Sequence, residues 1–174
     1  IAGLQDNGTK IRQTSGTWID RIGGDGMDCL VRPDNGSNMV GSLYNGNFYK
    51  SADGGLSFSG INTADNNTGA WVTPITVDPG KPQNIYIAYK RVHKSTDFGN
   101  TWTIISNQLN SGNMDFIAVS PSDDNYIYTG RSNALYRTTN GGATWSTMTI
   151  PASEIREIAI HPTNPNIIWV VRSN

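Results

Sequence analysis

The sequence predicts an all-β protein made of repeated antiparallel sheets. Nineteen glycines, with frequent Asn, Ser and Thr, indicate many tight turns between short strands. No stretch places apolar residues at helical spacing over three turns. One motif also recurs at a nearly constant interval, which is typical of repeat architectures. With 174 residues, 36% of them hydrophobic, the chain is long enough to bury a core.

The first repeated feature is an eight-residue motif that ends in an aromatic residue. Its copies occupy Ser51–Phe58, Ser95–Trp102 and Thr138–Trp145. The third residue of each copy is Asp53, Asp97 or Asn140, and these lie about 44 residues apart. A period of about 40–50 residues is typical of propeller blades or solenoid repeats.

A second repeated feature is a valine or isoleucine two residues before a proline, and it recurs at about the same interval as the first. It occurs at Pro33, Pro79, Pro121 and Pro162, and each time an apolar strand follows, introduced by an asparagine. The proline fits a turn where a ladder of hydrogen bonds has ended. Each unit therefore has a first strand ending at the proline turn, a second after it, a third leading into the eight-residue motif and a fourth beginning at its aromatic residue. Four such strands make a blade of a β-propeller.

The two repeated features divide the chain into segments. We expect 1–22 to be the end of one blade, 23–61, 62–105 and 106–148 to be complete blades, and 149–174 to begin another. Both Ile1–Leu4 and Asn166–Val171 fit the second-strand position, which favours part of a larger propeller. The alternative is a closed ring of four blades, in which the C-terminal strands complete the N-terminal blade.

The motif Ser95–Trp102 resembles the Asp box, or bacterial neuraminidase repeat, of sialidases, xyloglucanase-type glycoside hydrolases, sortilin-type receptors and photosystem assembly factors. Gly3–Thr9 together with Gly23–Gly26 resembles secreted bacterial proteins of this class that are labelled glycosyl hydrolases. The resemblance implies a bacterial protein that is secreted or located at the cell surface.

We interpret the motif as structural, because the carboxylate of Asp97 can accept hydrogen bonds from its own turn while Gly99 adopts a positive φ. The third copy supports this interpretation, since the amide of Asn140 can accept hydrogen bonds but cannot act as a general base. The residues assigned to this structural role are Ser51, Asp53, Gly55, Phe58, Ser95, Asp97, Gly99, Trp102, Thr138, Asn140, Gly142 and Trp145.

A ligand site is expected on the opposite face, where the remaining loops gather. Trp71 lies in the longest of these loops, and an aromatic ring with carboxylates suits a sugar. The alternative is that Trp71 begins a first strand and fills a gap between blades. The predicted ligand-binding residues are Trp71, Asp25, Asp65, Arg91 and Arg131.

Asp6 and Asp25 are candidates for a catalytic pair, since glycoside hydrolysis needs two facing carboxyl groups. The alternative is that both are solvated turn residues, as is usual in Asp-Asn-Gly and Gly-Asp-Gly sequences. A calcium site at Asp25 and Asp28 is a further alternative. Otherwise we expect no metal or cofactor.

Three functions remain open. The leading hypothesis is an extracellular binding module whose ligand is a carbohydrate. The alternatives are part of a glycoside hydrolase completed by other blades, and a sortilin-like scaffold for an extracellular protein or peptide. With 13 basic and 14 acidic residues and no basic run, the chain lacks the charge that nucleic-acid binding needs. No apolar run is long enough for membrane insertion, whereas exposed blade edges would favour self-association.

Overall fold

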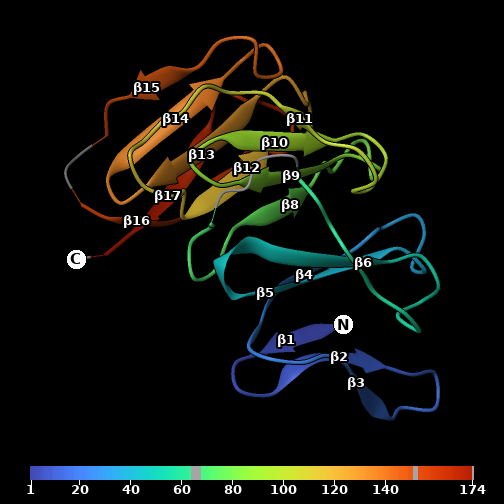
Figure 1. Cartoon of the computed structure of the whole chain (residues 1–174). Coiled ribbons are helices and arrows are strands. Elements are labelled where there is room, and N and C mark those ends of the chain that lie inside the picture. Colours follow the sequence, from blue (N-terminus) through green and yellow to red (C-terminus); the bar gives the residue numbers. More distant parts are fainter. Residues whose placement is uncertain (64–67, 151–152, 174) are drawn as a thin grey trace.

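The computed structural model describes residues 1–63, 68–150 and 153–173, and it confirms the all-β prediction (Figure 1). The described strands form antiparallel sheets, each made from one continuous stretch of the chain. The bounds are β1 (Ala2–Leu4), β2 (Gly8–Arg12) and β3 (Trp18–Ile22); β4 (Gly26–Val31), β5 (Met39–Leu43), β6 (Asn47–Ser51) and β7 (Ser59–Gly60); β8 (Ile75–Val77), β9 (Ile85–Ala88), β10 (Val92–Ser95) and β11 (Thr103–Ile104); β12 (Phe116–Val119), β13 (Ile127–Arg131), β14 (Ala134–Thr138) and β15 (Ser146–Met148); β16 (Ile155–Ile160) and β17 (Ile168–Arg172).

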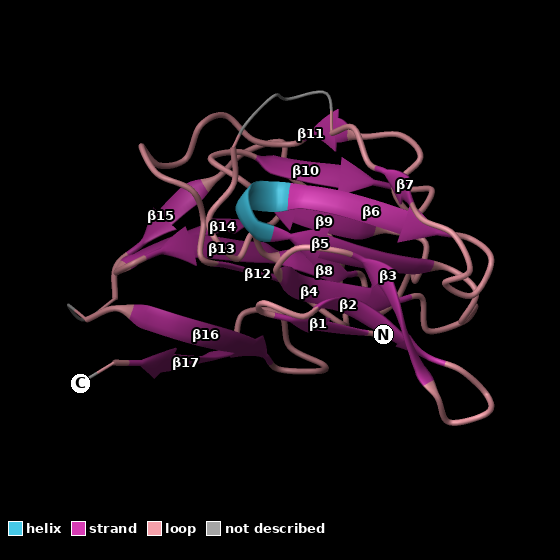
Figure 2. Ribbon diagram, turned by 60° about the horizontal axis from the view of Figure 1, so that its bottom comes forward, coloured by secondary structure: helices cyan, strands magenta, loops and turns pink. Residues whose placement is uncertain are grey.

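Three of these sheets have four strands that pair in chain order: β4–β7, β8–β11 and β12–β15. The first strands of successive sheets contact one another, so that β8 lies against both β4 and β12, and β12 lies against β16. Figure 2 shows β4, β8 and β12 side by side, with the later strands of each sheet spreading outward. The sheets are therefore arranged as propeller blades around their first strands.

The two ends of the chain form smaller sheets. β1, β2 and β3 make one sheet, and β16 pairs with β17 in another. Within the described residues, no strand pairing joins β16 or β17 to the β1–β3 sheet. The structure is therefore not the closed ring of four blades that the sequence left open.

The core lies between adjacent sheets, and β9 shows why. All four of its residues are 0% exposed, and alternate side chains point to opposite faces of a strand. Ile85 and Ile87 pack in a cluster with Val40 and Phe48 of the preceding sheet, whereas Tyr86 and Ala88 pack with residues of the following sheet such as Ile127. A strand buried on both faces needs an uninterrupted apolar sequence, which β9 has.

The described part of the chain contains one short 3-10 turn, Tyr44–Gly46 (η1), between β5 and β6. Among the described residues, no helix has the length and apolar character needed to cross a membrane.

Candidate functional site

The second eight-residue motif forms a closed set of local hydrogen bonds. The Ser95 hydroxyl donates to Asp97 Oδ1 at 2.8 Å and accepts the Gly99 N–H at 2.7 Å. Asp97 Oδ1 also accepts the N–H groups of Asn100 and Thr101, at 2.9 and 2.8 Å, and the Thr101 hydroxyl donates to Asp97 Oδ2 at 2.7 Å. Gly99 has the predicted positive φ, +88°. All the short contacts of the carboxylate are thus to its own turn.

The first and third copies repeat this pattern. Ser57 donates from its hydroxyl to Asp53 Oδ2 at 2.6 Å and from its N–H to Asp53 Oδ1 at 3.0 Å. In the third copy Asn140 Oδ1 accepts the Thr144 N–H at 2.9 Å, and Asn140 Nδ2 donates to the Thr144 hydroxyl at 2.8 Å. The amide therefore keeps the hydrogen bond to the Thr144 N–H and reverses the one to the hydroxyl, while the Ala143 N–H donates to the Asn140 main-chain carbonyl at 3.3 Å.

These hydrogen bonds make the motif carboxylates weak bases. Partial burial acts to raise the pKa of Asp97, but hydrogen bonds from Thr101 and Ser95 outweigh it and lower that pKa to about 2. The hydrogen bonds from the Ser57 side chain and backbone, together with that from Ser51, hold the pKa of Asp53 well below its usual range. A general acid or base works best with a pKa near the working pH, so this chemistry favours a structural role.

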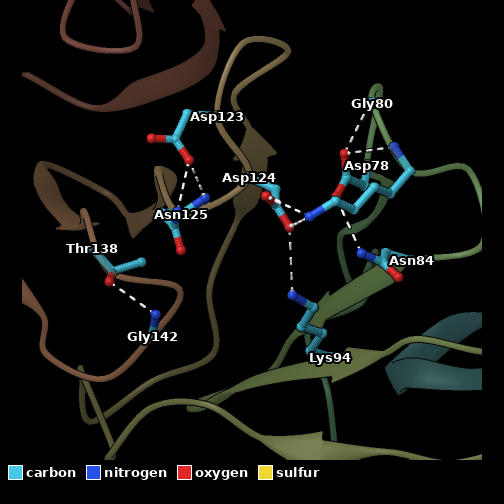
Figure 3. A network of polar contacts seen from close by, with 10 residues as sticks. Asp78, Gly80, Asn84, Lys94, Asp123, Asp124, Asn125, Thr138 and Gly142 are labelled. Atoms are coloured by element: carbon cyan, nitrogen blue, oxygen red, sulfur yellow. Dashed lines mark hydrogen bonds and ion pairs between the residues drawn. The ribbon is translucent and has the colours of Figure 1, made fainter.

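The proline turns lie at the same end of the sheets as the eight-residue motifs and are bonded to them. Phe98 N–H donates to the Gln83 carbonyl at 2.8 Å, and Gly141 N–H donates to the Asn125 carbonyl at 3.0 Å. Figure 3 shows that the turns are also polar: Asp78 accepts the Gly80 N–H at 2.9 Å. We call this end of the molecule the box face.

Ion pairs on the box face link one sheet to the next. Asp124, in the proline turn between β12 and β13, forms an ion pair with Lys81 of the preceding sheet, and its Oδ2 lies 2.8 Å from Lys81 Nζ. The same oxygen lies 3.9 Å from the Nζ atom of Lys94 on β10 (Figure 3). His161 lies at this end, where its Nδ1 accepts the Thr163 N–H at 3.3 Å, whereas His93, the second residue of β10, is buried edge-on against Tyr89 and lies away from it.

The opposite end, which we call the loop face, carries an exposed aromatic pair. Tyr44 of η1 and Trp71, which precedes β8, stack with ring centroids 5.3 Å apart and planes 10° apart. The Asn45 N–H donates to the Trp71 carbonyl at 3.3 Å, and the Gly69 N–H donates to the Asn45 carbonyl at 2.8 Å. Trp71 is 51% exposed and Tyr44 is 38% exposed, so the pair presents apolar surface to solvent.

This geometry corrects the alternative placement of Trp71. β8 begins only at Ile75, and half of the Trp71 side chain is exposed, so Trp71 neither begins a strand nor fills a gap between blades. Tyr44 was not among the residues predicted from the sequence. Its position in an Asn-Gly turn on the loop face was the available signal, but its contact with Trp71 depends on the meeting of two loops.

A cavity of about 570 Å³ lies beside the aromatic pair and is lined by Asp6, Asp20, Asp25 and Tyr44 among others. Asp25 Oδ1 accepts the Asp6 N–H at 2.6 Å, so the two carboxylate residues lie together at this cavity. Glycines make this approach feasible, because a Cβ on Gly26 would lie 2.4 Å from the Gly8 carbonyl oxygen. Asp20 forms an ion pair with Lys10.

A second cavity, of about 600 Å³, lies on the other side of η1. Its lining is rich in amide and hydroxyl groups and includes Asn45, Asn47, Asn62, Thr63 and Thr68. The predicted site residue Asp65 lies outside the described residues. Among those that are described, no group of three His, Cys, Asp or Glu side chains is placed to bind a metal ion.

The predicted arginines also lie on the loop face. Arg91 is in the turn between β9 and β10, and Arg131 ends β13; both are exposed. The Arg131 side chain lies across Gly112, since a Cβ at that glycine would be 2.4 Å from the guanidinium carbon.

The GH74 enzyme of Niastella koreensis superposes with a TM-score of 0.70 over 91% of this chain and 29% of that one, at 20% identity. The family model for sortilin, neurotensin receptor 3 (Sortilin-Vps10), matches residues 90–174. The motifs, the sheets and these matches agree. The chain is an Asp-box β-propeller.

Two curated relatives of this propeller are similar in sequence. A probable oligoxyloglucan-reducing end-specific xyloglucanase of Neosartorya fischeri is 28% identical over 123 residues, which is 62% of this chain and 15% of the relative. The xyloglucanase Xgh74A of Acetivibrio thermocellus is 33% identical over 96 residues, which is 43% of this chain and 11% of the relative. The propeller thus spans less than one sixth of the length of either enzyme in these matches.

Proposed function

We propose that this propeller binds a polysaccharide on its loop face, with a sugar ring stacked on the Tyr44–Trp71 pair. The observation that carries the proposal is the pair itself: two stacked, nearly parallel rings, exposed to solvent and fixed by backbone hydrogen bonds. A sugar ring has an apolar face of C–H groups that matches such a surface. Exposed aromatic side chains in folded proteins often mark a binding surface.

The surroundings of the pair supply the polar half of such a site. Amide and hydroxyl groups line the cavity on one side of η1, and the carboxylates of Asp6 and Asp25 line the cavity on the other. A few polar groups placed around an apolar contact are typical of ligand sites. The relatives named as xyloglucanases support a polysaccharide ligand, and such a ligand would place this propeller outside the cell.

The test is the affinity for soluble xyloglucan, measured by isothermal titration calorimetry. We expect Trp71→Ala to weaken binding by about 1.5–3 kcal/mol, which is the effect of losing a large apolar contact. Trp18→Ala is the matched control, because Trp18 is 49% exposed on β3 at the outer edge of the first sheet. Equal affinities for Trp71→Ala and the unmodified protein would refute the proposal.

The Asp6–Asp25 contact specifically favours a second function, glycoside hydrolysis. Two carboxyl groups at one cavity beside a stacking surface are the minimum that this reaction needs. Asp25→Asn keeps an acceptor for the Asp6 N–H but removes the ionisable group. Loss of xyloglucan turnover in this variant of the full-length protein, with binding retained, would establish the enzyme. Binding of a protein ligand that Trp71→Ala leaves unchanged would instead favour the interaction scaffold.

A further inference from the structure

Three arginines gather at the loop-face end of the last two sheets. Arg131 ends β13, Arg156 is the second residue of β16, and Arg172 ends β17. The sheets are joined at this point, because the Ile155 N–H donates to the Ser132 carbonyl at 2.7 Å and Ile155 is the register partner of Arg172. Arg156 and Arg172 therefore lie on paired strands, Arg131 precedes the residue of the adjacent sheet that Ile155 contacts, and all three arginines are exposed.

Arg131 differs from its neighbour Arg156 in its contacts. Arg156 forms an ion pair with Glu154 at 2.9 Å. Arg131 is in none of the ion pairs of the described residues. Its guanidinium lies on Gly112: a Cβ there would be 2.4, 2.5 and 2.6 Å from the Cζ, Nη1 and Nε atoms. The absence of a side chain at position 112 thus leaves the space that the guanidinium group occupies.

A continuous series of contacts connects Arg131 with the aromatic pair. Asn113, next to Gly112, donates from its side chain to the Thr68 carbonyl at 3.0 Å. The neighbouring Gly69 bonds to Asn45, and Asn45 bonds to Trp71. The arginine and the stacking surface are therefore connected through residues 68–71 and 112–113, which lie between them.

From this arrangement we infer that the polysaccharide is acidic: one of its neutral sugars stacks on Trp71 while the carboxylate of a uronic acid residue binds Arg131. This inference rests on the proposed function and names the class of glycan. A guanidinium group can bind a carboxylate through two parallel hydrogen bonds, and its charge does not depend on pH in the physiological range. Asp6 and Asp25 at the other end of the surface repel a second carboxylate, which favours a glycan that mixes neutral and acidic sugars.

The test compares glucuronoxylan with its carboxyl-reduced form, which has the same backbone but no charge. We expect the protein to bind the acidic form more tightly, with an advantage that decreases as salt rises. Arg131→Gln should reduce affinity for the acidic form about tenfold, the usual effect of a hydrogen bond to a charged group, and leave the reduced form unaffected. Gly112→Ala should also reduce affinity for the acidic form, because its Cβ displaces the Arg131 guanidinium group. Arg12→Gln, on β2 at the box-face end, is the charge-matched control.

The possible outcomes distinguish binding of an acidic glycan by Arg131 from stacking of a sugar on Trp71. If the protein and Arg131→Gln bind both forms equally, and Trp71→Ala abolishes that binding, the acidic glycan is refuted while the stacking site stands. If neither form binds and xyloglucan does not bind either, the proposed function itself fails. Melting temperatures of Arg131→Gln and Gly112→Ala within a few degrees of the unmodified protein exclude loss of folding as the cause.

Discussion

Replacing Asp97 by asparagine tests how the Asp box stabilises the propeller. The third box already contains this change: Asn140 keeps the backbone hydrogen bond to Thr144 and donates to its hydroxyl instead of accepting from it. Asp97→Asn should therefore preserve the turn, with Nδ2 donating to Thr101. The change removes a titratable group whose pKa in the folded protein is lowered to about 2.

The sign and size of the effect follow from that pKa. A carboxyl group whose pKa is lower in the folded than in the unfolded chain stabilises the fold above the unfolded value and loses this contribution as the pH falls through the folded value. The fall from 3.8 to about 2 corresponds to about 2.4 kcal/mol at full strength. Asp97 is partly exposed, so solvent screening reduces this to about 1 kcal/mol.

We expect Asp97→Asn to be less stable than the unmodified protein by about 1 kcal/mol at pH 7, with the difference vanishing near pH 2. Urea unfolding across this pH range measures it. Asp97→Ala is the contrast, because it removes the acceptor of two backbone N–H groups at every pH and should cost about 2–3 kcal/mol. A constant difference between Asp97→Asn and the unmodified protein from pH 7 to pH 2 would refute the electrostatic explanation.

Two further changes test the packing between blades, a third is their control, and a fourth tests an ion pair at the surface. Trp102 packs on the cluster that contains Val40 and Phe48, so Trp102→Ala should lower the free energy of unfolding by about 3 kcal/mol, measured by urea titration. Gly142 has a φ of +102°, and a Cβ there would lie 2.5 Å from the Ile105 carbonyl oxygen, so Gly142→Ala should cost more than about 2 kcal/mol. Gly36→Ala should change stability by less than about 1 kcal/mol, since nothing lies within 4 Å of its added Cβ. Asp124→Asn breaks the ion pair with Lys81 at the surface and should cost less than about 1 kcal/mol, with a smaller loss in 1 M salt when thermal melts are compared.

The sequence predicted the repeating parts of the structure because they follow local rules. A hydroxyl residue, an acidic or amide residue and a glycine at fixed spacing specify the box turn, and proline marks the turn before each second strand. The stack of Tyr44 on Trp71 obeys no such rule. It forms because the turn after β5 and the loop before β8 reach the same place, and loop conformations are not set by the repeat. The packing of Arg131 on Gly112 is hidden from the sequence for the same reason.

The loop face is also where the repeated units differ most from one another. The turn after the second strand of each four-stranded sheet carries Tyr44 after β5, Arg91 after β9 and Arg131 at the end of β13. The box-face turns of these three sheets share a proline, a hydroxyl residue, an Asp or Asn, a glycine and an aromatic residue at fixed positions. Side chains on the loop face are partly exposed and contribute little to the packing between sheets, so substitutions there cost little stability. Box-face substitutions, in contrast, break hydrogen bonds that hold the turns of each sheet together. A propeller of this kind can therefore change its ligand at the loop face while the box face preserves the fold, which is why the loop face is the place to look for specificity.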